Sequence, residues 1–130
     1  MIEPIKSLNK LYSGKVRELY DIDSNIMLMI ASDRISTFDV ILNQNIPNKG
    51  IYLTQISLFW FKLLESICKN HLTGIELTKY LSGDELDYAN GRGIIVQKLQ
   101  PIPIEVIVRG YLAGTGYKDY LKTGSICGIK

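Results

Sequence analysis

Near the N-terminus, two cations beside a glycine are the first residues in this sequence that could bind phosphate. The chain there reads Ser13, Gly14, Lys15, Val16, Arg17. A glycine between two strands lets the backbone approach an anion closely, and cations two residues apart on a strand leave the same face. The pattern predicts a phosphate grip made by residues 14–17. It matches neither a Walker A loop nor a dinucleotide fingerprint, so a hairpin with a solvated basic face remains the alternative.

A second candidate phosphate site combines a charged strand with a glycine-rich helix start. We expect a strand at residues 104–108, with Glu105 and Arg109 on one face. Three glycines then allow close backbone approach, and Thr115 can cap a helix over 115–122 whose first amides suit a phosphate. Arg109 can bind phosphate in bidentate fashion. Charge, glycine and helix start together favour this reading over a structural Arg–Glu pair.

Two further groups of polar residues follow apolar strands. Residues 32–39 gather two acids, one base and three hydroxyls, and such a loop can present polar groups to a ligand or be held by its own side-chain turns. The candidates for substrate binding in this loop are Ser32, Asp33, Arg34 and Ser36. Lys98 ends the apolar run 94–97, where it can reach a nucleotide phosphate or extend into solvent.

These groups must be positioned by helices and strands. The pattern of apolar and turn residues along the chain predicts an α+β fold with a largely antiparallel sheet and a packed helix. We expect that helix at residues 53–70, with Thr54 as its N-cap and its aromatic side chains buried. Strands are expected in a hairpin over 10–20 and at 26–31, 40–42, 93–99 and 104–108, with loops at 32–39 and 80–93.

Composition narrows the function classes. The 130 residues carry a formal net charge of +2 and are 46% hydrophobic, which suits a small-molecule site better than a nucleic-acid interface. No apolar run has membrane-spanning length, and Glu3 and Pro4 are unlike a signal peptide, so we expect a cytoplasmic protein. Cys68 and Cys127 are expected as reduced thiols. His71 is the only histidine, which excludes a multi-histidine metal site within these residues.

Four blocks of this sequence, read in order, resemble the SAICAR synthase family (phosphoribosylaminoimidazole-succinocarboxamide synthase). The blocks are residues 13–20, residues 32–36 with 38–40, residues 46–50 with 53–55 and 59–61, and residues 105–112 with 114–116. The resemblance implies two α+β domains of ATP-grasp-like character, with ATP and Mg²⁺ between them. It assigns residues 1–96 to an N-terminal ATP-lid domain. Residues 97–130 would begin a second, incomplete domain that binds ATP and the ribonucleotide.

The resemblance also implies roles for particular residues. Gly14, Lys15, Val16 and Arg17 would lie over the ATP phosphates, and Lys98 would lie on the nucleotide side. The same resemblance implies that Arg109 and Thr115 bind the 5′-phosphate of the ribonucleotide and that Glu105 lies near the imidazole. Lys15 and Glu105 are the catalytic candidates. Whether residues 32–36 bind L-aspartate or are structural stays open. The Mg²⁺ ligands are expected beyond residue 130.

The implied activity is ATP-dependent ligation of L-aspartate to carboxyaminoimidazole ribonucleotide through an acyl phosphate, giving SAICAR in purine biosynthesis. The implied partners are these small molecules and, in some arrangements, a second copy of the chain, but neither nucleic acid nor membrane. Family members are longer, so we expect an apparently truncated chain that is inactive alone. The alternatives are a non-catalytic nucleotide- or phosphate-binding module and a kinase-like lobe, which Gly14 alone does not support.

Overall fold

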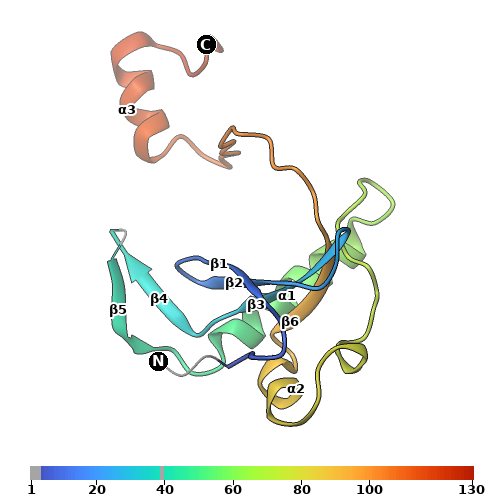
Figure 1. The fold of residues 1–130 in the computed structure, drawn as a ribbon. Helices are drawn as coiled ribbons and strands as arrows, with labels where there is room; N and C mark the ends of the chain where they lie inside the picture. Colours follow the sequence, from blue (N-terminus) through green and yellow to red (C-terminus); the bar gives the residue numbers. More distant parts are fainter. Residues whose placement is uncertain (1–3, 39) are drawn as a thin grey trace. The chain divides into compact units, whose positions relative to one another are not determined.

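The computed structural model describes residues 4–38 and 40–130, and the chain forms two compact units, Met1–Gln100 and Pro101–Lys130 (Figure 1). Glu3 and Asp39, which enter the expectations above, lie outside the described residues.

The first unit is built on a four-stranded antiparallel sheet. Its strands are β1 (Lys10–Ser13), β2 (Arg17–Asp21), β3 (Ile26–Ala31) and β6 (Gly93–Gln97), in the order β1-β2-β3-β6. The register pairs Glu18 with Ile30 and Leu28 with Ile95. The predicted α+β fold with a largely antiparallel sheet is confirmed.

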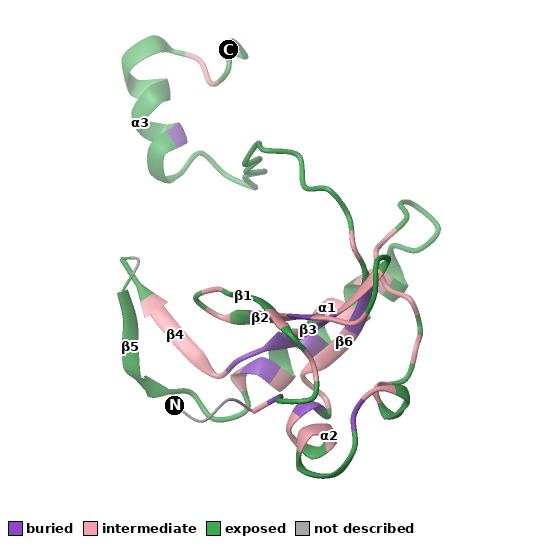
Figure 2. Cartoon of the chain, in the orientation of Figure 1, coloured by how far each residue is buried: buried purple, intermediate pink, exposed green. Residues whose placement is uncertain are grey.

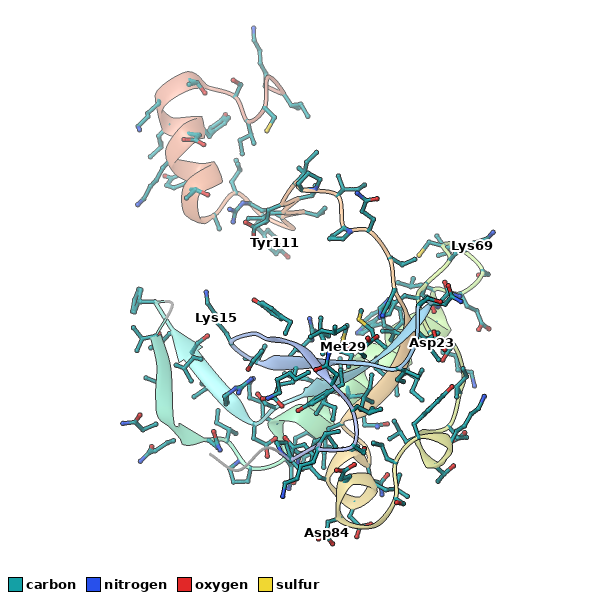
Figure 3. All side chains as sticks on the ribbon, viewed as in Figure 1. Lys15, Asp23, Met29, Lys69, Asp84 and Tyr111 are labelled. Atoms are coloured by element: carbon teal, nitrogen blue, oxygen red, sulfur yellow. The ribbon has the colours of Figure 1, made fainter. Side chains whose placement is uncertain are left out.

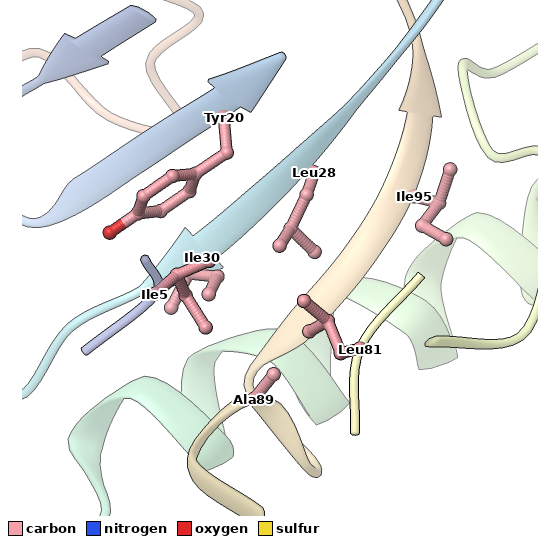
Figure 4. Close-up of a cluster of buried hydrophobic side chains, with 7 residues drawn as sticks. All are labelled: Ile5, Tyr20, Leu28, Ile30, Leu81, Ala89 and Ile95. Carbon is pink, nitrogen blue, oxygen red and sulfur yellow. The ribbon is translucent and has the colours of Figure 1, made fainter. Parts of the chain in front are cut away.

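The apolar sequence of β3 follows from its position inside the sheet. Strands covered on both faces read as continuous apolar runs rather than alternating ones. One face carries the main core, together with η1 (Leu77–Lys79) and α2 (Gly83–Ala89). Figure 4 shows the seven buried side chains of this core: Ile5, Tyr20, Leu28, Ile30, Leu81, Ala89 and Ile95. The opposite face packs against helix α1 (Lys49–Leu63).

Helix α1 begins four residues earlier and ends seven residues earlier than the sequence predicted. Asn48, in the left-handed conformation, occupies the N-cap position, so the prediction of Thr54 as the cap is wrong. The prediction of a well-buried helix is also wrong. Tyr52, Phe59 and Trp60 are more than half exposed, because apolar side chains lie around more of this helix than the side that meets the sheet.

Two segments expected as loops contain regular structure. Residues 34–37 form β4 (Arg34–Thr37), which pairs antiparallel with β5 (Val40–Asn45) in a separate two-stranded sheet. Short polar strands carry little hydrophobic periodicity, which is why the sequence reads here as a loop. Helix α2 lies within the expected loop 80–93, and burial of Ala89 in the core holds it there.

The second unit contains one helix, α3 (Gly114–Thr123), preceded by an irregular segment. The predicted strand at residues 104–108 is wrong. These residues pair with no strand in the described part of the chain, and Val106 and Val108 are 78% and 92% exposed. A strand needs a hydrogen-bonding neighbour, which alternation of side chains alone does not provide. Figure 2 shows how little of this unit is buried.

Within the described residues, no helix combines the length and apolar character that crossing a membrane requires. Cys68 and Cys127 are exposed free thiols.

Candidate functional site

The glycine turn joins β1 to β2 and is closed by its own backbone. The Gly14 amide donates to the Arg17 carbonyl at 2.8 Å. A Cβ atom on Gly14 would lie 2.9 Å from the exposed Tyr12 ring, which would have to move aside. Lys15 extends from the tip of the hairpin (Figure 3). Because Lys15 precedes β2 and Arg17 is its first residue, the expectation that both cations share one strand face does not describe this turn.

Residues that follow β3 donate hydrogen bonds to the backbone carbonyls of this turn. The Ser32 amide and hydroxyl both donate to the Val16 carbonyl, at 2.8 and 3.1 Å. Arg34 donates to the carbonyls of Gly14 at 2.9 Å and Lys15 at 3.3 Å. Three consecutive carbonyl oxygens of the turn are therefore held by the segment 32–34.

A buried carboxylate balances the charge of Arg34. Glu18, 6% exposed, accepts a hydrogen bond from Arg34 at 3.0 Å and one from the Tyr20 hydroxyl at 2.8 Å. Lys10 approaches the same carboxylate at 3.8 Å. A buried charge needs such partners to offset its loss of hydration.

Asp33 fixes the start of α1. Its carboxylate accepts hydrogen bonds from the amides of Gly50 at 2.8 Å and Asn48 at 3.3 Å, and it pairs with Arg92 at 3.1 Å. Burial alone would raise the pKa of the Asp33 carboxyl, but the Gly50 amide and the Arg92 charge outweigh burial and the pKa lies below its ordinary value. Of the four loop candidates, Ser32, Asp33 and Arg34 thus contact the protein itself, and Ser36 lies in β4 opposite Ile41.

Lys98 follows β6 at the far end of the sheet. Its amide donates to the Asn25 carbonyl at 2.8 Å, and its ammonium donates to the Asp21 carboxylate and the Asp23 carbonyl. These contacts fix the ammonium beside the turn that joins β2 to β3.

A cavity of about 200 Å³ lies between the sheet and α1. Its lining includes His71 and Arg92, and Nε2 of His71 and Nε of Arg92 are buried without a hydrogen-bond partner among the described residues. Burial, reinforced by the charge of Arg17, lowers the pKa of the His71 imidazole. The Phe61 ring meets this imidazole edge-on at 5.3 Å. Sequence reasoning missed both residues, since neither belongs to a recognisable motif.

In the second unit, Arg109 lies against the start of α3. Its guanidinium donates to the Thr115 hydroxyl at 3.0 Å. Cβ atoms on Gly114 and Gly116 would lie 3.3 and 3.2 Å from guanidinium nitrogens, so both glycines make room for it. The structure therefore brings together Arg109, Thr115 and the glycines. Glu105 lies in the exposed irregular segment before them.

Across residues 4–38 and 40–130, no three histidine, cysteine or acidic side chains gather as a metal site.

Comparison with known proteins supplies the family. The sequence profile of SAICAR synthetase matches residues 10–127. The chain belongs to the SAICAR synthetase family. A phosphoribosylaminoimidazole-succinocarboxamide synthase of Haemophilus influenzae (strain PittGG) is 57% identical over 127 residues, which cover 98% of this chain and 44% of the relative. The chain thus spans less than half the length of this member of the SAICAR synthetase family.

Solved structures of the SAICAR synthetase family share the fold. SAICAR synthase from Saccharomyces cerevisiae, complexed with SAICAR, superposes with a TM-score of 0.87 at 40% identity, covering 100% of this chain and 46% of that one. A type-2 SAICAR synthetase in complex with ADP superposes with a TM-score of 0.66 at 32% identity, covering 83% of this chain and 41% of that one. The resemblance found in the sequence is confirmed.

Proposed function

We propose that this chain supplies nucleotide and ribonucleotide contacts of a ligase that uses ATP to join L-aspartate to carboxyaminoimidazole ribonucleotide. Family membership supports the proposal, as do the names of the relatives and the SAICAR and ADP bound in two of the solved structures. The activity belongs to proteins about twice the length of this chain, and we extend it to the protein of which these residues are part.

The observation that carries the proposal is the placement of Arg109 at the start of α3. The first amides of a helix carry partial positive charge, and a guanidinium beside them is unfavourable on its own. An anion bound to both relieves this repulsion, and the Thr115 hydroxyl adds a further polar contact. A phosphate ester has the charge and oxygen geometry for such a site. We assign it the 5′-phosphate of the ribonucleotide.

We assign the phosphates of ATP to the turn between β1 and β2. Residues 14–17 bring two cations to one turn, and three of its carbonyls accept hydrogen bonds from Ser32 and Arg34. Arg17 also lines the cavity under α1, and Lys98 lies beyond the other end of β3. Residues 1–96 would then act as the ATP lid and residues 97–130 would begin the second domain.

The proposed reaction has two steps. A carboxylate oxygen of the ribonucleotide attacks the γ-phosphorus of ATP, which breaks the bond to ADP and forms an acyl phosphate. The amine of L-aspartate then attacks the acyl carbon, loses a proton, and expels phosphate with the electron pair of the broken C–O bond. The protein contributes mainly positioning and charge neutralisation. Lys15 is the candidate for stabilising the transferred phosphoryl group, and Glu105 for contacting the imidazole end.

Two separate titrations test the two assignments. Lys15→Ala should weaken binding of ATP while leaving binding of the ribonucleotide unchanged. Arg109→Ala should do the reverse and cost roughly 2–4 kcal/mol in ribonucleotide binding through the lost charge-assisted contact. Isothermal titration with each ligand, in the presence of Mg²⁺, measures both effects.

The outcomes separate the proposal from its alternative. Formation of SAICAR from ATP, L-aspartate and the ribonucleotide by the complete protein would establish the ligase. Binding of both ligands without any product would favour a non-catalytic phosphate-binding module. An Arg109→Ala variant with unchanged ribonucleotide affinity would remove the 5′-phosphate from the start of α3.

A further inference from the structure

We propose that Arg34 is a positioning residue that fixes the turn between β1 and β2. With Ser32, it holds the carbonyl oxygens of Gly14, Lys15 and Val16, and so sets the direction in which the turn presents its amides. The ligand of the turn rests on the proposed function, whereas the conformational role of Arg34 does not.

The guanidinium of Arg34 matches three acceptors with its three nitrogens. Nε donates to the Lys15 carbonyl at 3.3 Å, one terminal nitrogen to the Gly14 carbonyl at 2.9 Å, and the other to Glu18 at 3.0 Å. The side chains of Arg34 and Glu18 are only 13% and 8% exposed. A planar fork of donors can serve all three acceptors at once, which a lysine ammonium on a flexible stem cannot do with the same geometry.

The scaffold behind Arg34 is itself anchored. Its carbonyl accepts a hydrogen bond from the Lys49 ammonium at 2.9 Å, and Lys49 is the first residue of α1. The preceding residue, Asp33, binds the amides that start the same helix. The turn is thereby connected through Arg34 to α1, the longest helix described in the unit.

The functional consequence concerns the direction of the peptide dipoles. Each carbonyl oxygen carries partial negative charge, and a peptide that rotates its carbonyl toward a phosphate repels it. Holding three consecutive carbonyls on one side prevents that rotation. Anion affinity then depends on Arg34 although its charge is balanced by Glu18 and the two turn carbonyls.

The test compares Arg34→Lys with a matched control. Arg34→Lys keeps a cation for Glu18, so it should fold even where Arg34→Gln does not. The control is Glu85→Gln, since Glu85 also makes three hydrogen bonds that anchor a loop, to the amides of Lys6 and Ser7 and to the Ser7 hydroxyl. That loop is separate from the turn.

Amide hydrogen exchange at Gly14 and Ser32, whose amides donate to the carbonyls of Arg17 and Val16 at 2.8 Å, followed by NMR without ligand, is the first measurement. We expect exchange there to accelerate about 10- to 100-fold in Arg34→Lys, corresponding to the loss of hydrogen bonds to a charged donor, and to remain unchanged in Glu85→Gln. Unchanged exchange in Arg34→Lys would overturn the inference. This result does not depend on whether the wild-type protein binds a nucleotide.

Affinity for Mg²⁺–ATP and for adenosine is the second measurement. Arg34→Lys should weaken ATP binding by a similar factor and leave adenosine binding unchanged, because only ATP has phosphates for the turn. Equal losses for both ligands would instead show a general structural defect and overturn the positioning role. A wild-type protein with no ATP affinity would contradict the proposed function, while faster exchange in the variant would still support the role of Arg34.

Discussion

Three of the cations named as candidates, Arg34, Lys98 and Arg109, differ in what neutralises their charge. Arg34 is paired with Glu18, and Lys98 is paired with Asp21. In the part of the chain that the structure describes, the guanidinium of Arg109 contacts a hydroxyl and two glycines rather than a carboxylate. Its charge is therefore available to a ligand anion, whereas the charge of Arg34 is used within the protein.

His71 should make the stability of the protein depend on pH in a defined window. Burial lowers the pKa of its imidazole below the ordinary 6.5, so the unfolded chain takes up a proton at a higher pH than the folded protein. Stability should therefore be constant above that value and fall as the pH drops from about 6.5 toward the folded-state pKa, by at most about 1.4 kcal/mol per pH unit. Urea unfolding at about pH 7.5 and 5.5 measures the change.

The control is His71→Gln, which removes the titrating group. His71 is the only histidine in the sequence. The carboxyls with lowered pKa, such as Asp33 and Glu85, contribute stability that the protein loses only at lower pH. The variant should therefore unfold with the same free energy at both pH values. If the wild-type protein is equally stable at both, the imidazole is not held neutral by its surroundings.

At the level of elements, the start of α1 depends on a close approach between two backbones. A Cβ atom on Gly50 would lie 2.2 Å from the Ala31 carbonyl oxygen, which is rigid backbone at the end of β3. Gly50→Ala should therefore destabilise the first unit by roughly 1–3 kcal/mol or more, because the helix start must move away from the strand. Chemical denaturation followed by circular dichroism measures this loss.

Gly110→Ala is the matched substitution for that experiment. A Cβ atom on Gly110 meets no atom within 4 Å, and the residue is outside the left-handed region. The free energy of unfolding of the Gly110→Ala variant should stay within about 0.5 kcal/mol of the wild-type value. Equal stabilities of the two variants would show that the contact between Gly50 and Ala31 does not limit the packing of α1.

Elements whose signal is local were predictable, and elements decided by distant contacts were not. The hairpin around Gly14, the apolar strand β3 and the strand β6 follow from alternation and turn residues. The start of α1 could not be predicted in this way, because the Asp33 carboxylate, from another part of the chain, binds the first amides of the helix. In the same way the sequence indicated Arg109 with Thr115, which are six residues apart, but it could not show Arg34 reaching back to Gly14.

At the scale of the whole molecule, the two units differ in how much they can stabilise themselves. The first has a core of seven buried apolar side chains and a four-stranded sheet. Among residues 101–130, all of which the structure describes, only Gly116 is buried. A 10-residue helix without a core is marginal in water. Local opening should therefore be much easier in the second unit than in the first.

Hydrogen exchange of the free protein should show this difference, with amides of β3 exchanging about a hundredfold or more slowly than those of α3. The ribonucleotide should slow exchange in α3, because a ligand that binds only the folded site stabilises it in proportion to its saturation. Arg109→Ala should abolish the slowing by removing the guanidinium that meets the start of the helix. If α3 were already as protected as β3 without ligand, the second unit would not depend on the ribonucleotide for its order. If the ribonucleotide slowed exchange equally in Arg109→Ala, the phosphate would be bound elsewhere.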